Sequence, residues 1–224
     1  MFASRNPSYD RFKSLRGGVF TLEGIIGVGK TTLGRSLENY LKEIGIDAKF
    51  FPEYVNEKLL GQYISDMKRY AYSFQMIMLC KRIEIYREAE RFAKTGGVAI
   101  IDRSMVGDMT FACMQKDNGN FTDDEWETYI SMMTQEIQLT PSASVFLRCT
   151  AETSMRRVKQ RGILSEINGY TVEYMKQLQE AYDKTIDDCT SVRHIIIDWN
   201  DPIPMYNNGN LNTKFVEDVL GKLL

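Results

Sequence analysis

The sequence is poor in histidine and in paired cysteines, on which many catalytic and metal sites depend. His194 is the only histidine among the 224 residues, and it lies in the apolar run HIIID. The four cysteines, Cys80, Cys113, Cys149 and Cys189, are far apart and form no CxxC pair. A histidine-based triad, a histidine-rich metal site, a zinc site and a disulfide framework are therefore disfavoured, and free thiols are expected.

Strong net charge and long apolar segments are also lacking. The formal net charge is −2, with 28 basic and 30 acidic residues, so no overall field attracts nucleic acid or a membrane surface. No apolar run reaches the length of a transmembrane helix, and no signal-peptide pattern opens the chain. We therefore expect a cytoplasmic protein without nucleic-acid or membrane partners.

The length and composition of the chain fit one globular domain. With 43% hydrophobic residues and no repeat or linker, residues 17–224 are expected to form a single domain with a full core. Residues 1–16 hold four basic residues and one acid and are expected to be a flexible tail. An organelle-targeting peptide is the alternative interpretation of this tail, and Pro7 and Asp10 disfavour it.

Short apolar runs alternate with amphipathic segments along the chain. The expected strands are residues 18–24, 47–51, 97–102, 143–149 and 193–198. The expected helices are residues 30–44, 56–66, 73–94, 105–116, 122–138, 152–161, 171–187 and 211–223. Apolar strands separated by helices predict the α/β class, with a five-stranded parallel sheet and helices on both faces.

One glycine-rich segment has the pattern of a phosphate-binding loop. Residues 24–31, GIIGVGKT, match GxxxxGK[ST] between an expected strand and an expected helix, which is typical of P-loop NTPases. Glycines let successive backbone N–H groups face one centre, and the helix N-terminus adds partial positive charge. Lys30 then reaches the β- and γ-phosphates, and Thr31 holds Mg²⁺. The expected ATP-binding residues here are Gly24, Ile25, Ile26, Gly27, Val28, Gly29, Lys30, Thr31 and Thr32.

This loop alone leaves two classes of protein open, a nucleotide-dependent switch and a small-molecule kinase. A switch that reads guanine typically carries an NKxD motif and a DxxG segment after its second strand. The sequence has no NKxD motif and no obvious DxxG segment at that place. These absences favour the kinase.

Charged residues stand at the ends of two expected strands. Glu53 follows the strand 47–51, and Asp102 and Arg103 end the strand 97–102. Ligands of open α/β sheets bind at the carboxyl ends of strands, so we expect these side chains beside the phosphate loop. Glu53 is the candidate base for a hydroxyl acceptor, Asp102 the candidate carboxylate for Mg²⁺, and Arg103 the candidate bridge to the transferred phosphate.

One expected helix face combines an amide, a guanidinium and apolar side chains. Gln75, Met78 or Leu79, and Arg82 recur at positions i, i+3 or i+4, and i+7. The Gln75 amide offers a donor and an acceptor side by side, which suits a flat heterocycle. Asp108 is expected to pair with Arg82 and to accept from an exocyclic amino group. An exposed amphipathic face is the alternative.

Four segments together resemble the motifs of the deoxyribonucleoside kinase family. LEGIIGVGKTT resembles its phosphate loop, FPEYV its catalytic-base segment, YAYSFQ its base-binding segment and DRS its second acidic motif, in order between Val19 and Leu178. The resemblance implies Mg²⁺-dependent transfer of the γ-phosphate of ATP to the 5′-hydroxyl of a deoxyribonucleoside. It also implies a homodimer.

The resemblance implies roles for single residues. Glu53 deprotonates the 5′-hydroxyl, Arg103 orients it and the γ-phosphate, and Gln75 hydrogen-bonds the base. Thr31 and Asp102 serve Mg²⁺, and Lys30 completes the catalytic set. Arg82 and Asp108 match the pair found in the branch that acts on deoxycytidine, deoxyguanosine and deoxyadenosine, so thymidine is expected to be disfavoured.

The segment RRVKQRGILSEINGY resembles the lid of this family, here expected as a polar loop at about residues 161–169. Arg157 and Arg161 match arginines that bind phosphoryl oxygens, and they are four residues apart, so both can point one way. Glu166 matches the glutamate that accepts from the 3′-hydroxyl of the sugar. Closure of such a lid excludes water from the reaction.

The sequence departs from the family pattern at several positions. The tryptophan often found shortly after the catalytic glutamate is absent, and Tyr54 or another aromatic residue is the expected substitute. Ile163 and Ser165 stand where many relatives have an arginine and an acidic residue. Ile64 stands where relatives usually have the tyrosine that contacts the 3′-hydroxyl, and the adjacent Tyr63 is the expected substitute.

Two rival functions make different demands on the same residues. A nucleoside-monophosphate kinase of the thymidylate kinase type shares the EGI opening of the loop. That type typically has an acidic residue where this chain has Ile26, and Asp-Arg-Tyr or Asp-Arg-His where this chain has Asp-Arg-Ser104. A P-loop switch predicts slow hydrolysis without an acceptor and a dispensable Glu53.

Overall fold

The architecture is built on one five-stranded parallel sheet, as predicted. The structure, a computed structural model, describes residues 7–135, 140–188, 192–200 and 211–224. The strands lie in the order β2-β3-β1-β4-β5, and every neighbouring pair is parallel. Their bounds are β1 Val19–Glu23, β2 Ala48–Phe51, β3 Val98–Asp102, β4 Ala143–Arg148 and β5 His194–Asp198.

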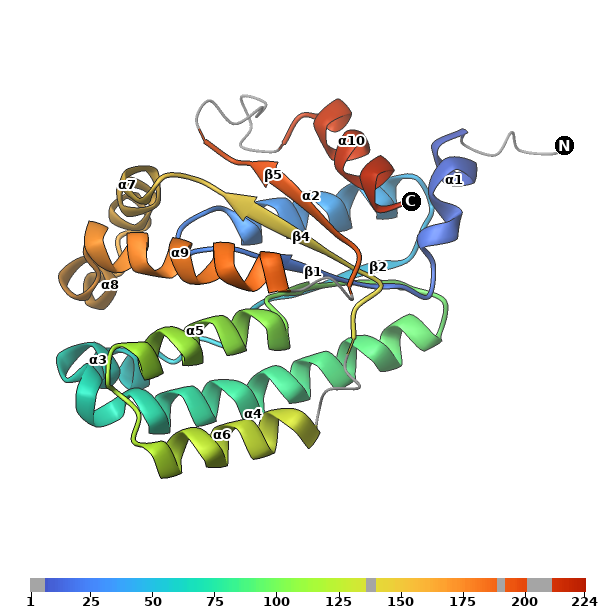
Figure 1. The fold of residues 1–224 in the computed structure, drawn as a ribbon. Helices are drawn as coiled ribbons and strands as arrows, with labels where there is room; N and C mark the ends of the chain where they lie inside the picture. Colours follow the sequence, from blue (N-terminus) through green and yellow to red (C-terminus); the bar gives the residue numbers. More distant parts are fainter. Residues whose placement is uncertain (1–6, 136–139, 189–191, 201–210) are drawn as a thin grey trace, which may run out of the picture.

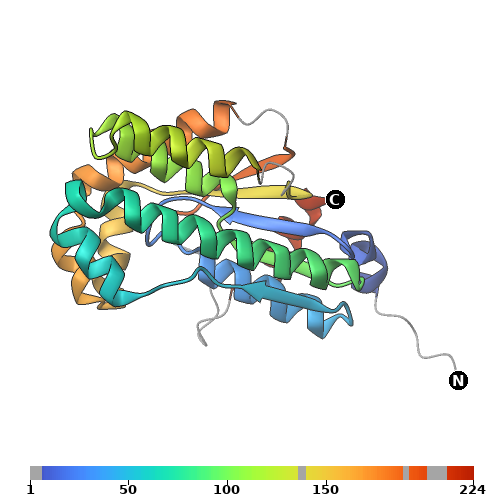
Figure 2. The ribbon, with the colours of Figure 1, turned by 90° about the horizontal axis from the view of Figure 1, so that it is seen from below.

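Helices cover both faces of this sheet (Figure 1). α2 and α10 pack on one face, and α4, α5 and α9 cover the other, with α6 outside α4 (Figure 2). The helices are α1 Pro7–Phe12, η1 Lys13–Leu15, α2 Lys30–Glu43, α3 Glu57–Ser65, α4 Met67–Lys94, α5 Met105–Asp117, α6 Asp123–Gln135, α7 Ala151–Arg161, α8 Leu164–Gly169, α9 Val172–Asp188 and α10 Thr213–Leu223.

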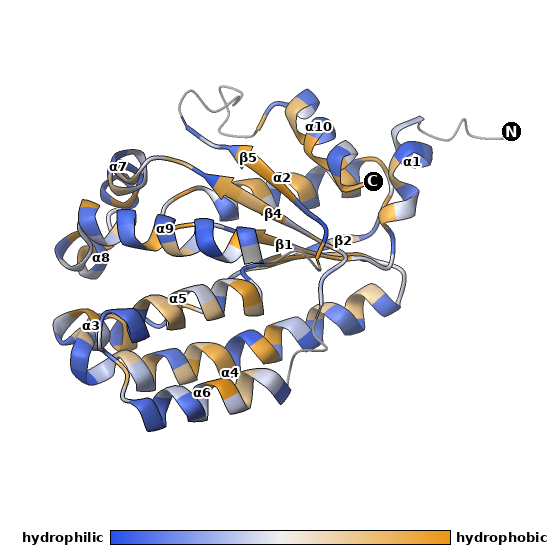
Figure 3. Cartoon of the chain, in the orientation of Figure 1, coloured by the Kyte–Doolittle hydropathy of each residue, from blue (hydrophilic) through white to orange (hydrophobic). Residues whose placement is uncertain are grey.

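The central strands are apolar because helices exclude water from both of their faces. All five residues of β1 and of β3 are buried, and the neighbouring strand β4 is mostly hydrophobic in Figure 3. The edge strand β5 is less covered, and its Ile196 is 43% exposed. The core is therefore thickest around β1 and β3, the two strands that lead into the candidate site.

Strand register brings the predicted site segments together. Leu22 of β1 pairs with Asp102 of β3, and Glu23 pairs with Phe146 of β4, so these strands end side by side. The helices α3, α7 and α8 lie beyond these carboxyl ends (Figure 1). They add walls to the space above the sheet, which is where open α/β sheets bind ligands.

The prediction of a flexible tail is wrong for residues 7–16, which form α1, η1 and the turn into β1. Phe12 is fully buried, with its ring 6.2 Å from that of Tyr40, and Arg16 Nε donates to the Gly96 oxygen at 3.1 Å. A large aromatic ring removed from water stabilises this segment in spite of its polar composition. Residues 1–6 lie outside the described residues.

Other expected boundaries also shift. α4 begins at Met67 rather than at residue 73, because the Asp66 side chain accepts from Arg69 N at 3.1 Å and caps a longer helix. The lid, expected as a loop, is largely the short helix α8 after a left-handed Gly162. The helix expected to end at residue 138 is described to Gln135, and the rest lies outside the described residues.

Two predictions from composition, on disulfides and on membrane-spanning helices, can be compared with the described residues. Cys80, Cys113 and Cys149 form no disulfide with one another, as expected, whereas Cys189 lies outside the described residues. Among the helices that the structure describes, none is both long and apolar enough to cross a membrane.

Candidate active site

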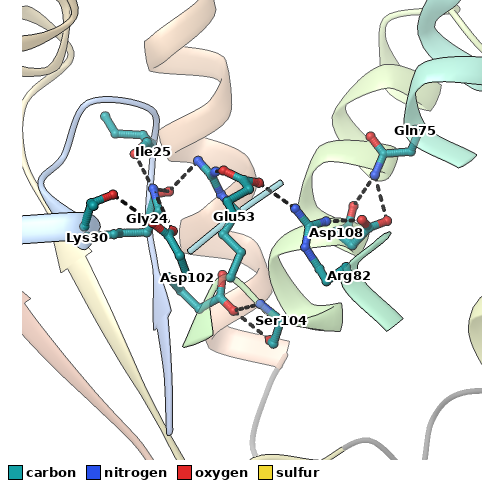
Figure 4. A network of polar contacts seen from close by, with 12 residues as sticks. Gly24, Ile25, Lys30, Glu53, Gln75, Arg82, Asp102, Ser104 and Asp108 are labelled. Carbon is teal, nitrogen blue, oxygen red and sulfur yellow. Dashed lines mark hydrogen bonds and ion pairs between the residues drawn. The ribbon is translucent and has the colours of Figure 1, made fainter. Parts of the chain in front are cut away.

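A cavity of about 810 Å³ opens at the carboxyl ends of the strands. Its loop end is lined by Ile26, Gly27, Gly29, Lys30, Thr31 and Thr32. Its α4 end is lined by Phe74, Gln75, Met78 and Arg82. Glu53 lies between the two ends (Figure 4). Of the residues predicted for the site, those that do not line the cavity are Gly24, Ile25, Val28, Tyr63 and Asp108.

The loop between β1 and α2 has a backbone that glycine permits. Gly24, Gly27 and Gly29 have φ angles of 135°, 72° and 116°, which L side chains rarely adopt. Ile25 and Val28 are fully buried and belong to the core, so they contribute backbone rather than side chains to the site. The N–H groups that follow these glycines lead directly into the N-terminus of α2, a favourable place for an anion.

Lys30, the first residue of α2, is buried among loop carbonyls. Its Nζ donates to the Gly24 oxygen and to the Ile25 oxygen, both at 3.1 Å. Burial and the nearby Arg103 lower the pKa of Lys30 to about 8. The side chain is therefore mostly a cation at neutral pH and titrates just above it.

Asp102, at the end of β3, faces Thr31 of α2. Thr31 Oγ1 donates to Asp102 Oδ2 at 3.1 Å, and Lys30 Nζ lies 4.0 Å from Oδ1. That Oδ1 is buried and has no hydrogen-bond partner within the described ranges, and burial raises the pKa of Asp102. A hydroxyl and an unpartnered carboxylate oxygen beside a phosphate loop form an oxygen donor set that suits Mg²⁺, which takes few protein ligands.

Glu53, which follows β2, lies between two arginines. Arg82 Nη2 donates to Glu53 Oε1 at 2.7 Å, and Arg103 Nη1 donates to Glu53 Oε2. Burial opposes ionisation of the carboxyl group, but the charges of Arg103 and Arg82 outweigh it and lower the pKa of Glu53. Glu53 is thus a carboxylate at neutral pH, held in a fixed position in the middle of the cavity.

At the α4 end, Asp108 fixes the orientation of Gln75. Gln75 Nε2 donates to Asp108 Oδ1 at 2.7 Å and to the Asp108 backbone oxygen at 3.1 Å. Both atoms are acceptors, so the amide nitrogen must face Asp108. Gln75 Oε1 then points away from Asp108 (Figure 4) and makes no hydrogen bond to any residue that the structure describes.

Asp108 itself is fully buried, and its oxygens are used inside the protein. Besides Gln75, Arg82 Nη1 donates to Oδ2 and the Tyr129 hydroxyl donates to Oδ1 at 2.8 Å. Burial raises the pKa of Asp108. The expected pairing of Asp108 with Arg82 is thus present. The expected direct contact of Asp108 with a ligand is not, because Gln75 and Arg82 lie between Asp108 and the cavity.

On the same helix face, Met78 lines the cavity and Leu79 belongs to the core.

The predicted lid residues line the cavity from the side of α7 and α8. Arg157 donates from Nη1 to the Val28 oxygen and from Nη2 to the Trp199 oxygen, both at 2.8 Å, so it supports the phosphate loop from below the lid. Arg161 forms an ion pair with Glu166, whose side chain is 8% exposed. The i,i+4 arginines therefore do not act alike in this structure.

The expected substitute Tyr63 does not reach the cavity. Its hydroxyl accepts from Gln115 Nε2 at 2.6 Å and lies 3.2 Å from the Tyr174 hydroxyl, inside the core. Tyr170, which we did not predict, lines the cavity instead and is 7% exposed. Its spacing of four residues from Glu166, one helical turn, was the available signal for this residue.

The Tyr170 hydroxyl lies among the charged groups of the site. It makes no hydrogen bond to any part of the chain that the structure describes. Burial raises its pKa well above the ordinary value, and the charges of Glu166 and Glu53 act in the same direction. The hydroxyl is therefore a neutral donor, on a side chain that lines the cavity, and two carboxylates lie near enough to affect its pKa.

Taken together, the cavity can bind an anion at one end, remove a proton at its centre and contact a planar polar group at the other end. The proton acceptor and the phosphate loop are joined by Arg103, which donates from Nη2 to the Gly24 oxygen at 3.3 Å as well as to Glu53. This is the geometry needed for phosphoryl transfer to a hydroxyl group.

Comparison with known proteins points the same way. The profile of the family described as Deoxynucleoside kinase matches residues 20–223. A deoxyadenosine kinase of Dictyostelium discoideum is 28% identical over 87% of this chain and 78% of its own length. A deoxyadenosine/deoxycytidine kinase of Bacillus subtilis is 25% identical over 76% and 77%.

Solved structures agree on the fold. A structure of deoxyadenosine kinase from M. mycoides with dCMP and dCDP superposes with a TM-score of 0.69, at 21% identity, covering 90% of this chain and 96% of that one. Other sequences that match include thymidylate kinases.

Proposed function

Because the chain belongs to the deoxynucleoside kinase family and is therefore a phosphotransferase, we propose that it transfers the γ-phosphate of ATP to the 5′-hydroxyl of a deoxyribonucleoside. The observation that carries this proposal is the position of Glu53. An ionised carboxylate bound by Arg82 and Arg103 lies between a phosphate loop and a polar, planar-group site within one cavity. A hydrolase or switch needs no such base on the side away from the loop.

At the loop end, ATP phosphates are bound by the loop N–H groups, by Lys30 and by the N-terminus of α2. Thr31 and Asp102 would hold Mg²⁺, and the unpartnered Asp102 Oδ1 supports this assignment. When bound, the ion neutralises charge that develops on the β- and γ-phosphates. Arg157 and Arg161 serve the phosphates from the lid, and for Arg161 this requires release from Glu166.

At the centre, Glu53 accepts the proton of the 5′-hydroxyl as its oxygen bonds to the γ-phosphorus, while the bond from that phosphorus to the β,γ-bridging oxygen breaks and ADP leaves. Arg103 contacts both this base and the loop, so it places the attacking oxygen in line and stabilises the charge on the transferred group. The lowered pKa of Glu53 means that the base is ready at neutral pH without a prior proton loss.

At the α4 end, the nucleobase of the substrate lies against Gln75, Met78 and Phe74. Gln75 Oε1 accepts a hydrogen bond because its nitrogen is held by Asp108, so the site favours a base that presents an N–H group at that point. Exocyclic amino groups of adenine and cytosine are such donors. We therefore propose a preference for amino-bearing bases, with Asp108 acting through Gln75 and Arg82.

The sugar lies between the base site and Glu53. Glu166 and Tyr170 are the candidate contacts for its 3′-hydroxyl, one as an acceptor and the other as a donor. This assignment gives Tyr170 the role that the sequence suggested for Tyr63.

The alternative acceptor is a nucleoside monophosphate, as in thymidylate kinases. Two observations weigh against this acceptor. Ile26, which lines the loop end, replaces the acidic residue typical of thymidylate kinases, and Ser104 stands after Asp102-Arg103 where that type has Tyr or His. A panel of the four deoxynucleosides, their monophosphates and a no-acceptor control, each with Mg-ATP, distinguishes the two acceptors. Product from a deoxynucleoside is expected, whereas product only from a monophosphate, or ADP without an acceptor, would contradict the proposal.

A further inference from the structure

Among the residues that the structure describes, the mechanism above leaves one buried acidic group without a role. Glu23 ends β1, immediately before the phosphate loop, and is 0% exposed. Burial raises the pKa of this carboxyl group. A buried acid of this kind is costly unless its oxygens are hydrogen-bonded, so its partners indicate what it does.

Glu23 holds the turn between β3 and α5. Its Oε1 accepts from Ser104 N at 2.7 Å and from Ser104 Oγ at 2.6 Å. Ser104 is in turn the N-cap of α5, because its Oγ accepts from Val106 N at 3.2 Å. The acid therefore lies at a helix N-terminus, where negative charge is favoured, and fixes the residue that starts that helix.

The turn that Glu23 holds is strained at Arg103. Arg103 has a φ angle of 67°, and it is the only residue other than glycine with positive φ in the described part of the chain. Such a backbone conformation persists only where the surroundings impose it. Arg103 N donates to the Leu22 oxygen at 2.9 Å on one side, and the Glu23–Ser104 bonds fix the other side.

A second path joins the same acid to the Arg103 side chain. The Tyr182 hydroxyl lies 3.4 Å from Glu23 Oε2 and accepts from Arg103 Nε at 3.3 Å. Gly107 of α5 leaves room for this arrangement, since a Cβ there would lie 2.4 Å from Glu23 Oε2 and 3.3 Å from Arg103 Cδ. Backbone and side chain of Arg103 are thus both tied to Glu23.

We propose that Glu23 is a positioning residue for the reaction: through Ser104 and Tyr182 it imposes the left-handed turn that places the Arg103 guanidinium on Glu53 and on the phosphate loop. Glu23 touches no reacting atom, since it does not line the cavity. The inference rests on the proposed function, in which Arg103 stabilises the transferred phosphate.

The test is a double-mutant cycle between Glu23→Ala and Arg103→Ala, in which kcat and KM are measured with Mg-ATP and deoxyadenosine. Glu23→Ala should lower kcat about 100-fold, the cost of a displacement of about 1 Å at a reacting group, and change both KM values less than about threefold. In the Arg103→Ala background the same change should lower kcat less than about threefold. Glu23→Gln keeps an oxygen for Ser104 and should stay within about threefold of the wild type.

A purely structural role gives a different result. The losses would then multiply, so that Glu23→Ala costs about 100-fold in both backgrounds, and that outcome overturns the inference. Wild-type kcat in Glu23→Ala overturns it as well. Glu43→Ala, at an exposed glutamate at the end of α2, is the matched control and should leave kcat unchanged.

A second variant covers the case in which Glu23→Ala does not fold. Ser104→Ala removes one of the two donors to Glu23 and should lower kcat about tenfold in the wild type but less than about threefold in the Arg103→Ala background. Equal losses in both backgrounds contradict the inference. If the wild type itself forms no deoxynucleoside monophosphate, the proposed function fails and this inference with it, whereas a productive wild type with multiplicative losses overturns the inference alone.

Discussion

The loop end and the α4 end of the cavity use different kinds of interaction. From the loop to the centre, the side chains form a network of charges in which Lys30, Asp102 and Arg103 lie close to Glu53. At the α4 end and beside the lid, the atoms that face the cavity without a partner in the described chain are neutral, namely Gln75 Oε1 and the Tyr170 hydroxyl.

This difference separates chemistry from recognition. Buried charges interact strongly, and removing one member leaves the others uncompensated, so variants in the charged network should have large effects on turnover. A neutral hydrogen bond contributes only about 1 kcal/mol net, so variants at the α4 end should change the choice among ligands by smaller factors. The expected effects below fall in that order.

The largest effect on turnover is expected at the catalytic base, Glu53. Glu53→Gln should lower kcat about 1000-fold, because an amide cannot accept the proton of the 5′-hydroxyl, while the Kd for ATP should change less than about threefold. Glu57→Gln, at an exposed residue of the neighbouring helix α3, is the control and should retain wild-type kcat. Steady-state rates together with ATP binding by calorimetry check this prediction, and near-normal turnover in Glu53→Gln would remove Glu53 from the mechanism.

The parts of the fold that sequence predicted are those with a strong local signal. The apolar runs, the turn glycines and the helix caps predicted the strands and the parallel sheet that the described part of the chain forms. Residues 7–16 were misjudged because the burial of Phe12 depends on contact with Tyr40, which no local pattern reveals. The early start of α4 depends on a single capping side chain, Asp66, between two helices.

The same contrast applies to the site. The residues at strand ends, such as Glu53 and Asp102, were predictable because parallel strands end on one edge of the sheet. Tyr170 and Glu23 were not predicted, because their roles depend on where α8 and α5 pack in three dimensions. Asp108 was recognised, but its burial behind Gln75 was not visible in the sequence.

At the loop end, the charge of Lys30 should make ATP binding depend on pH. Its pKa of about 8 is below the ordinary lysine value, so the charged fraction falls as pH rises through 8. Only the cation attracts phosphate, so the Kd for ATP should rise roughly eightfold between pH 7.5 and pH 9. Calorimetric titrations over that range measure the effect.

Arginine at this position gives the matched control. Lys30→Arg stays charged at pH 9, so its Kd for ATP should vary less than about twofold over the same range. If the variant and the wild type show the same pH dependence, Lys30 is not the titrating group.

Beside the lid, Tyr170→Phe removes one hydroxyl and should lower kcat/KM for deoxyadenosine about fivefold, which corresponds to about 1 kcal/mol. The loss should vanish for the 3′-deoxy analogue, which lacks the hydroxyl that Tyr170 is proposed to contact. Competition assays with both substrates provide the measurement.

Tyr63→Phe makes the same chemical change in the core and is the control for that experiment. It should leave the ratio of the two substrates unchanged, although losing the bond to Gln115 should reduce thermal stability slightly. A change in the ratio with Tyr63→Phe and none with Tyr170→Phe would return the sugar contact to the residue that the sequence suggested.

The smallest effect concerns the choice of base. Asp108→Ala frees the Gln75 amide to rotate, so that either its oxygen or its nitrogen can face the cavity. The preference for deoxyadenosine over thymidine, measured as a ratio of kcat/KM values in one mixture, should fall about three- to fivefold. Gln75→Met, which has no hydrogen-bonding amide, should lower the same ratio by at least as much. If Gln75→Met changes the ratio and Asp108→Ala does not, the orientation of the Gln75 amide is set by something other than Asp108. Recognition of the nucleobase at the α4 end would then not depend on this buried acid.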